Sequence, residues 1–100
     1  MKQARQLLKE WQFPYIVVGG VPLVRKAEWE LCVQRIFRER CALHGYEMFI
    51  LFEDGRIQPD VDWSASWSPC TLPTVEEILA QLSEAPREMS HVEFIFSKNC

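Results

Sequence analysis

The chain has 100 residues, of which 48% are hydrophobic and 25% are charged. A chain of this length folds around one core without metal or disulfide support, and this composition excludes wholesale disorder. No apolar run approaches the roughly 20 residues of a membrane-spanning helix. Residues 1–44 carry eight Lys or Arg against four Asp or Glu, whereas residues 45–100 carry three against ten. This asymmetry favours association of the chain with itself or with a charged partner, unless folding mixes the two halves on one surface.

Residues 1–12 are predicted to form an N-terminal helix, because their apolar side chains fall on one helical stripe. The stripe consists of Ala4, Leu7, Leu8 and Trp11. The segment lacks the continuous apolar stretch and the small-residue cleavage site of a signal peptide. We therefore expect a cytoplasmic protein whose four cysteines are reduced.

Residues 13–100 alternate strand and helix patterns. Strands are expected at 15–18, 46–52, 57–67 and 91–98, and helices at about 25–44 and 74–83. Gly45 suits the position after the first helix, and Thr74 with Glu77 forms a capping box for the second. This βαββαβ order is that of a split βαβ, ferredoxin-like unit. The sequence predicts a single α+β domain over residues 1–100, with a four-stranded, mainly antiparallel sheet, helices on one face and the extra N-terminal helix.

The second and third strands are predicted to pair around Asp54-Gly55, which favours a two-residue type I′ turn. In that register the eight residues on the core face of the sheet are all apolar or aromatic. The other face, which we call the open face, then carries Glu47 opposite Asp62, Phe49 opposite Asp60 and Leu51 opposite Gln58. Opposed carboxylates repel one another unless water, a basic partner or a shared proton relieves them.

Pro59 conflicts with a central position for the strand at 57–67, where a ferredoxin-like sheet places it. Proline lacks the N–H group that a central strand needs, so it prefers an edge strand or a bulge. Either a bulge accommodates Pro59, or this strand lies at the edge of the sheet.

The open face also carries apolar residues that need a cover. The cover would be the N-terminal helix, a second copy of the chain or another protein. Trp67 lies beyond the paired part of its strand, either as a lid over the edge of the core or as an exposed contact. The predicted protein-binding residues are Phe49, Leu51, Asp60, Asp62, Trp67 and Ile95. These features predict a small non-catalytic protein that acts as an adaptor, inhibitor or regulatory subunit, with a homodimer through the open face as one form.

A second hypothesis concerns the loop after the first strand, where Gly19 and Gly20 precede Arg25. Glycines allow close backbone approach, so this loop, a helix N-terminus and Arg25 would together hold a small anionic metabolite. The layout resembles that of ACT-type regulatory domains, which bind small effectors beside the loop after the first strand. A P-loop signature is absent, and Pro22 removes one N–H donor.

Catalysis and metal binding are not expected. Cys41 and His44 form one close pair of ligands, whereas zinc sites usually present two such pairs. A third hypothesis, a cysteine-dependent enzyme, would need His91 beside Cys70, in acidic surroundings that would raise the thiol pKa. The pI of about 5.3 and the acidic open face argue against nucleic acid. The sequence thus predicts no cofactor, no metal, no nucleic-acid partner and no membrane partner.

Overall fold

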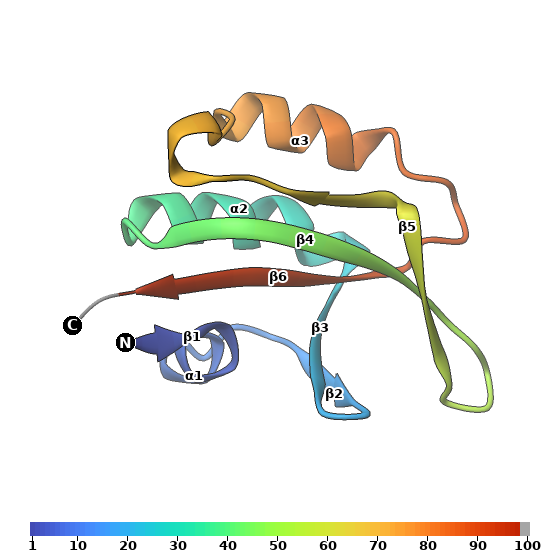
Figure 1. Ribbon diagram of the computed structural model, residues 1–100. Coiled ribbons are helices and arrows are strands. Elements are labelled where there is room, and N and C mark those ends of the chain that lie inside the picture. Colours follow the sequence, from blue (N-terminus) through green and yellow to red (C-terminus); the bar gives the residue numbers. More distant parts are fainter. Residues whose placement is uncertain (99–100) are drawn as a thin grey trace.

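The computed structural model describes residues 1–98, except for the side chains at positions 61 and 69. Its main elements are β1 (Lys2–Gln3), α1 (Ala4–Glu10), β2 (Ile16–Val18), β3 (Val21–Arg25), α2 (Trp29–Arg38), β4 (Ala42–Leu51), β5 (Ile57–Ser66), α3 (Val75–Ser83) and β6 (His91–Lys98). Over the described residues this is an α+β fold, in which three helices pack against an antiparallel sheet (Figure 1).

The prediction of a four-stranded, ferredoxin-like sheet is wrong. The described strands form a six-stranded sheet in the order β2-β3-β6-β4-β5, and β1 pairs with β6. A ferredoxin-like unit would place its first and third strands side by side at the centre. Here β6 lies between β3 and β4 instead. Element order alone does not decide which strands become neighbours.

The first predicted strand is one arm of a hairpin. Val18 pairs with Val21, which leaves Gly19 and Gly20 as a two-residue turn. Their φ angles of 57° and 81° are those that a type I′ turn requires. The chain then continues as β3, so α2 begins later than the predicted residue 25.

Helix α2 ends in a Schellman motif in which Arg40 takes the position usually held by glycine. The N–H of Cys41 donates to the Ile36 carbonyl (3.1 Å), and the N–H of Arg40 donates to the Phe37 carbonyl (3.0 Å). Arg40 has a φ of 57°, in the left-handed region that is costly for a residue with a Cβ atom. The helix therefore ends before residue 44, where Gly45 was expected to terminate it, and Gly45 lies within β4.

Replacing Arg40 by glycine is expected to stabilise the fold, because glycine adopts this φ without steric cost. The greater freedom of glycine in the unfolded chain offsets part of the gain, which leaves about 0.5–1 kcal/mol. Urea unfolding of Arg40→Gly measures the effect. Gln34→Gly, at an exposed position in the interior of α2, is the control, because glycine there costs about 1 kcal/mol. Equal destabilisation by both substitutions would contradict the strain at Arg40.

The β4–β5 turn lies where Asp54-Gly55 predicts it, but the loop has a different length. The N–H of Gly55 donates to the Phe52 carbonyl (3.0 Å), and the N–H of Phe52 donates to the Arg56 carbonyl (2.9 Å). With a φ of 89° at Gly55, this is the geometry of a three-residue loop with a G1 bulge. The predicted register is therefore wrong by one residue near the turn.

Strand β5 lies at the edge of the sheet, which confirms one of the two interpretations of Pro59. Pro59 pairs with Phe49, and its ring needs no partner on the outer side. Between the pairs Tyr46–Ala65 and Met48–Asp60, β4 advances two residues while β5 advances five. The extra residues of β5 form a bulge next to the middle of β4.

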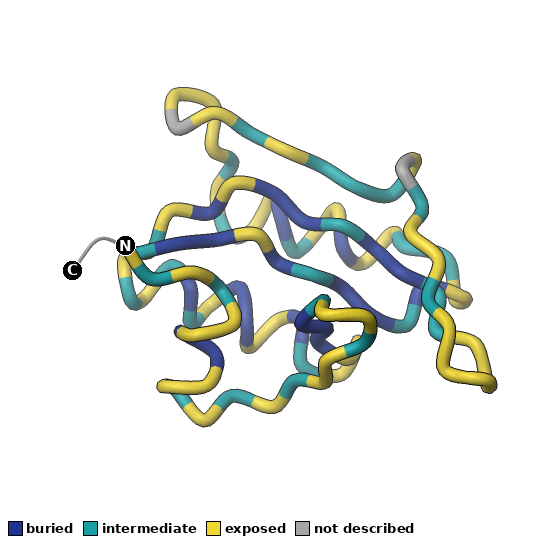
Figure 2. Tube along the Cα trace, turned by 60° about the horizontal axis from the view of Figure 1, so that its bottom comes forward, coloured by how far each residue is buried: buried dark blue, intermediate teal, exposed yellow. Residues whose placement is uncertain are grey.

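The core lies between the sheet and the helices, and the stripe predicted for residues 1–12 faces it. Its buried members are Leu7, Leu8, Val24, Trp29, Cys32, Val33, Ile36, Leu43, Tyr46, Met48, Ile78, Leu82, Met89, Val92, Phe94 and Phe96. The capping box of α3 is confirmed, because the N–H of Glu77 donates to the Thr74 hydroxyl (3.2 Å) and the N–H of Thr74 donates to the Glu77 carboxylate (3.3 Å). Figure 2 shows burial along the middle strands, whereas the β4–β5 turn is exposed.

Helix α1 belongs to the same layer as α2 and α3. The ring of Trp11, directly after α1, stacks on Phe96 with centroids 5.7 Å apart. The guanidinium of Arg35 from α2 lies 5.0 Å from the centroid of the same Trp11 ring. Leu7 and Leu8 are also buried in the shared core. The N-terminal helix therefore does not cover the open face of the sheet. In the described part of the chain, no helix has the length and apolar character needed to cross a membrane.

Candidate functional site: the open face of the sheet

The open face is defined by alternation along the two central strands. Phe94 and Phe96 point into the core, so Glu93 and Ile95 of β6 point to the other side. Cross-strand partners share a face, which adds the β4 and β5 partners of these residues. The open face consists of Arg25 from β3, Ala42, Gly45, Glu47, Phe49 and Leu51 from β4, Ile57, Pro59 and Ser66 from β5, and His91, Glu93, Ile95 and Ser97 from β6.

Two carboxylates oppose each other at the centre of this face. Glu47 and Glu93 are direct cross-strand partners, and both side chains are half-buried. Burial raises the pKa of Glu93, and the nearby charge of Glu47 raises it further. Within residues 1–98, no ion pair joins either carboxylate to a cation. The pair is therefore an unneutralised acidic centre.

A shallow hollow of about 270 Å³ adjoins the acidic centre. It is lined by Tyr46, Glu47, Ser64, Ala65, Ser66 and Ile95. Ile95 is 42% exposed, which makes it one of the large apolar side chains that water reaches. Gly45 lies between Ile95 and Ser66 and contributes no side chain to this row. The hollow thus combines a carboxylate, hydroxyl groups and an exposed apolar side chain.

The end of the open face near the β4–β5 turn is closed. Phe49 is 4% exposed and pairs with His91, which is 9% exposed. Ser90 Oγ lies 2.7 Å from His91 Nδ1. Burial lowers the pKa of His91, and Arg25 on the neighbouring strand lowers it further. Phe49 therefore serves the packing of this end and presents little surface to a partner.

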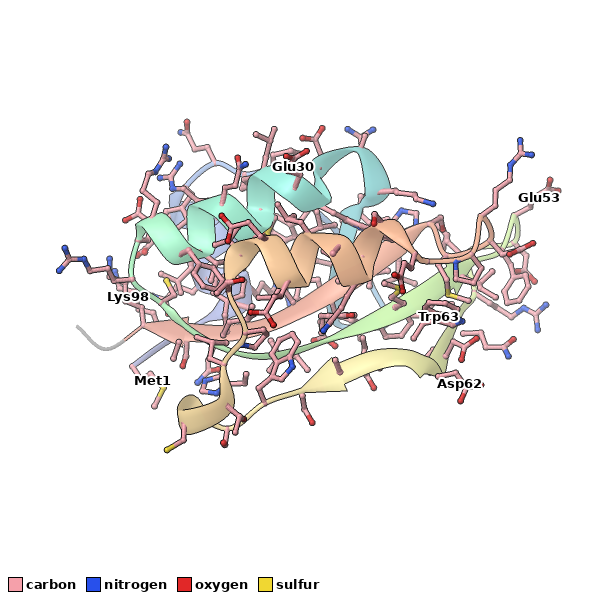
Figure 3. The ribbon with its side chains drawn as sticks, turned by 90° about the horizontal axis from the view of Figure 1, so that it is seen from above. Met1, Glu30, Glu53, Asp62, Trp63 and Lys98 are labelled. Atoms are coloured by element: carbon pink, nitrogen blue, oxygen red, sulfur yellow. The ribbon has the colours of Figure 1, made fainter. Side chains whose placement is uncertain are left out.

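The acidic cluster predicted on the open face does not form. Asp60 pairs with Met48 and so lies on the opposite face from Glu47. Its Oδ1 accepts the N–H of Asp62 at 3.0 Å, a local contact within the β5 bulge. Figure 3 shows Asp62 on β5, away from the end that holds Met1 and Lys98. Leu51 pairs with Ile57 near the turn and is half-buried.

Trp67 packs against the edge of the core. Its ring centroid lies 5.6 Å from that of Tyr46, and the backbone N–H of Trp67 donates to the His44 carbonyl at 2.9 Å. The side chain is partly buried against the main core. This is the arrangement expected of the lid, one of the two interpretations of Trp67.

The structure does not bring together the residues of the ligand-loop hypothesis. Gly19 and Gly20 form the β2–β3 turn at one end of β3, whereas Arg25 lies at the other end. A guanidinium nitrogen of Arg25 contacts the Glu28 carboxylate at 3.5 Å. A strand, and no helix N-terminus, follows the glycines.

The cysteines and histidines are dispersed. Within residues 1–98, no three His, Cys, Asp or Glu side chains gather closely enough to hold a metal ion. Cys70 is exposed in a short 3-10 helix, and His91 is buried in β6. Burial raises the pKa of the Cys41 thiol, although Lys98 opposes this effect. Cys100 lies outside the described residues.

Glu93→Gln is expected to raise stability at pH 7 and to have little effect at pH 4. The raised pKa of Glu93 means that the folded state holds this proton more tightly than the unfolded state. Its stabilising contribution is complete below the ordinary pKa of 4.5 and is lost as the pH rises through the raised value. Thermal unfolding at both pH values measures the effect, with the exposed Glu30→Gln as control. A larger gain at pH 4 than at pH 7 would contradict the assignment.

The Glu47–Glu93 pair is not among the contacts predicted from the sequence. The available signal was one acidic residue in each of two apolar strands, "YEMFILF" and "HVEFIF", at a polar position of the alternation. These two residues become partners only once β4 and β6 are known to be neighbours. Comparisons of the chain with protein-family models, curated proteins and solved structures find no significant match.

Proposed function

We propose that the chain is a non-catalytic protein that binds another protein through the open face of its sheet. The observation that carries the proposal is the Glu47–Glu93 pair beside the exposed Ile95, on a face that α1 leaves uncovered. Like charges placed directly opposite one another on a sheet are destabilising. Binding of a cationic partner would relieve this repulsion, which gives the pair a role in binding. The three described cysteines are free thiols, which supports the proposed cytoplasmic location.

The partner that fits this face is a cationic segment with apolar residues beside its charges. Lys or Arg would neutralise Glu47 and Glu93, and an apolar side chain would cover Ile95 and the hollow next to it. A homodimer formed face to face about a twofold axis would bring the two acidic centres together, because each copy presents the same patch. Charge therefore favours a different protein over a second copy.

A pair of matched peptides tests the proposal. The probes are an alternating Lys–Val hexapeptide and an alternating Glu–Val hexapeptide, each titrated into ¹⁵N-labelled full chain. The cationic peptide is expected to shift the amide signals of residues 45–47 and 93–95. Glu93→Gln is expected to raise the Kd of this peptide about threefold. Equal binding of both peptides, or shifts confined to the helices, would contradict the proposal.

The oligomeric state separates this proposal from the homodimer. Light scattering at neutral pH is expected to give the mass of a monomer. Ile95→Ser identifies any contact through the open face, and Leu31→Ser on α2, where the side chain is 55% exposed against 42% for Ile95, is the control. A dimer that Ile95→Ser alone dissociates would show that a second copy is the partner.

A further inference from the structure

A second candidate site lies at the end of the sheet where β4 begins and β6 ends. A cavity of about 510 Å³ opens there. It is lined by Met1, Arg40, Ala42, His44, Ser97 and Lys98. Figure 3 shows Met1 and Lys98 at this end, far from Glu53 in the β4–β5 turn. The lining contains basic side chains and a hydroxyl group, and no acidic residue is among the lining residues that the structure describes.

The first basic side chain reaches the cavity from a strained backbone position. Arg40 occupies the left-handed position that ends α2, with a φ of 57°. Glycine would satisfy the same Schellman hydrogen bonds without strain. Non-glycine residues in this region cluster at binding and catalytic sites, where the side chain serves a function. The left-handed position alone does not require a ligand, since Gln12 holds the same position after α1 with a φ of 56°. A ligand on the Arg40 guanidinium would give arginine a role here that glycine cannot fill.

The second basic side chain is positioned by a bulge in β4. Leu43 pairs with Phe96 and Gly45 pairs with Ile95, which leaves His44 as the extra residue. Bulges change the direction of a side chain and are frequent beside active sites. Here His44 Nε2 lies 2.9 Å from Ser97 Oγ. Ser97 is only 5% exposed, so this contact holds the imidazole at the cavity wall.

Among the described residues, the charge balance around the cavity is positive. Glu39 is the acidic residue next to Arg40 in the chain, and its carboxylate already contacts Arg35 at 2.9 Å and Lys98 at 3.6 Å. The single negative charge of Glu39 is thus shared by two cations, and the positive charge of Arg40 comes in addition. Arg40 takes part in no ion pair within residues 1–98.

We propose that this cavity binds the phosphate group of a small soluble ligand. The guanidinium of Arg40 would donate two parallel hydrogen bonds to phosphate oxygens, the geometry for which arginine is suited. Because His44 and Ser97 share one hydrogen bond, the pair would donate one further hydrogen bond to a phosphate oxygen, either from the Ser97 hydroxyl or from His44 Nδ1. Lys98 would add positive charge. The site goes beyond the protein-binding function proposed for the open face. Neither Glu93 nor Ile95 lines the cavity, so the failure of one proposal leaves the other intact.

Titration of the ¹⁵N-labelled full chain with inorganic phosphate, at constant ionic strength against chloride, tests this site. Saturable shifts are expected for the amides of Arg40, His44 and Ser97. Arg40→Gly is expected to raise the Kd at least about tenfold, because charge-assisted hydrogen bonds are lost. The same variant is expected to fold at least as stably as the parent chain, which separates lost binding from lost structure.

The control is Arg87→Gln, which removes one positive charge from an exposed position before β6, at the other end of the sheet. Its Kd for phosphate is expected to be unchanged. Three results would overturn the proposal: no saturable shifts in the parent chain, unchanged affinity in Arg40→Gly, or equal weakening in Arg87→Gln. The last result would show a response to net charge alone.

Discussion

Gly45→Ala is expected to destabilise the fold by about 3 kcal/mol, near the upper end of the effects of overpacking. A Cβ atom at position 45 would collide with the backbone carbonyl oxygen of Ala65 on the neighbouring strand. Since the obstacle is backbone in a paired strand, a change of rotamer cannot relieve the overlap. Thermal unfolding is expected to show a melting temperature lower by more than about 10 °C.

The control for this prediction is Ala42→Ser, which also adds one heavy atom to β4 but at an exposed position. It is expected to change stability by less than about 0.5 kcal/mol. If Gly45→Ala matched the control, the close approach of β4 and β5 at this point would be wrong. The bulge that brings Ala65 opposite Tyr46 would then need a different register.

Leu8→Ala is expected to cost about 3 kcal/mol, the usual loss for truncating a buried leucine. Leu8 is 1% exposed and lies in the core shared with α2 and the sheet. Leu31→Ala on α2, where the side chain is 55% exposed, is the matched control and is expected to cost less than about 0.5 kcal/mol. Urea unfolding compares the two variants.

The burial of Leu8 does not by itself show which face of the sheet α1 covers. A double-mutant cycle tests this. Trp11 stacks on Phe96, a core-facing residue of β6. Trp11→Leu and Phe96→Leu are therefore expected to couple by about 0.5–1.5 kcal/mol. Trp11→Leu and Ile95→Ala lie on opposite faces of the sheet and are expected to be additive. Coupling of Trp11 to Ile95 would place α1 across the open face.

Sequence patterns predicted the helices and strands well where the signal comes from residues close together in the chain. The stripe from Leu7 to Trp11, the capping box of Thr74 with Glu77 and the alternation of β6 all depend on residues a few positions apart. Helix α2 was predicted too long, because Arg40 replaces glycine in its terminal motif and the apolar pattern runs on into β4. Nothing in the sequence indicates that an arginine adopts a positive φ angle, whereas glycine at this position would have suggested the end of the helix.

The sheet was predicted less well because its order is a long-range property. Asp54-Gly55 marked the turn, but the three-residue loop moved Asp60 to the other face from Glu47. One extra loop residue thus removed the predicted acidic cluster. The true acidic pair, Glu47 with Glu93, joins strands that are distant in the chain. Pro59 was the local residue that indicated the correct edge position of β5.

Partner binding through the open face requires that this face be accessible to solvent in the free chain. Methyl-labelled protein with an inert, soluble gadolinium chelate measures this accessibility, because paramagnetic broadening reports distance from solvent. Strong broadening is expected for the Ile95 methyl signals and little for those of Val92, which is fully buried on the core face. Ile95 methyl groups as protected as those of Val92 would show that the open face is covered in the free chain and would rule out the proposed binding surface.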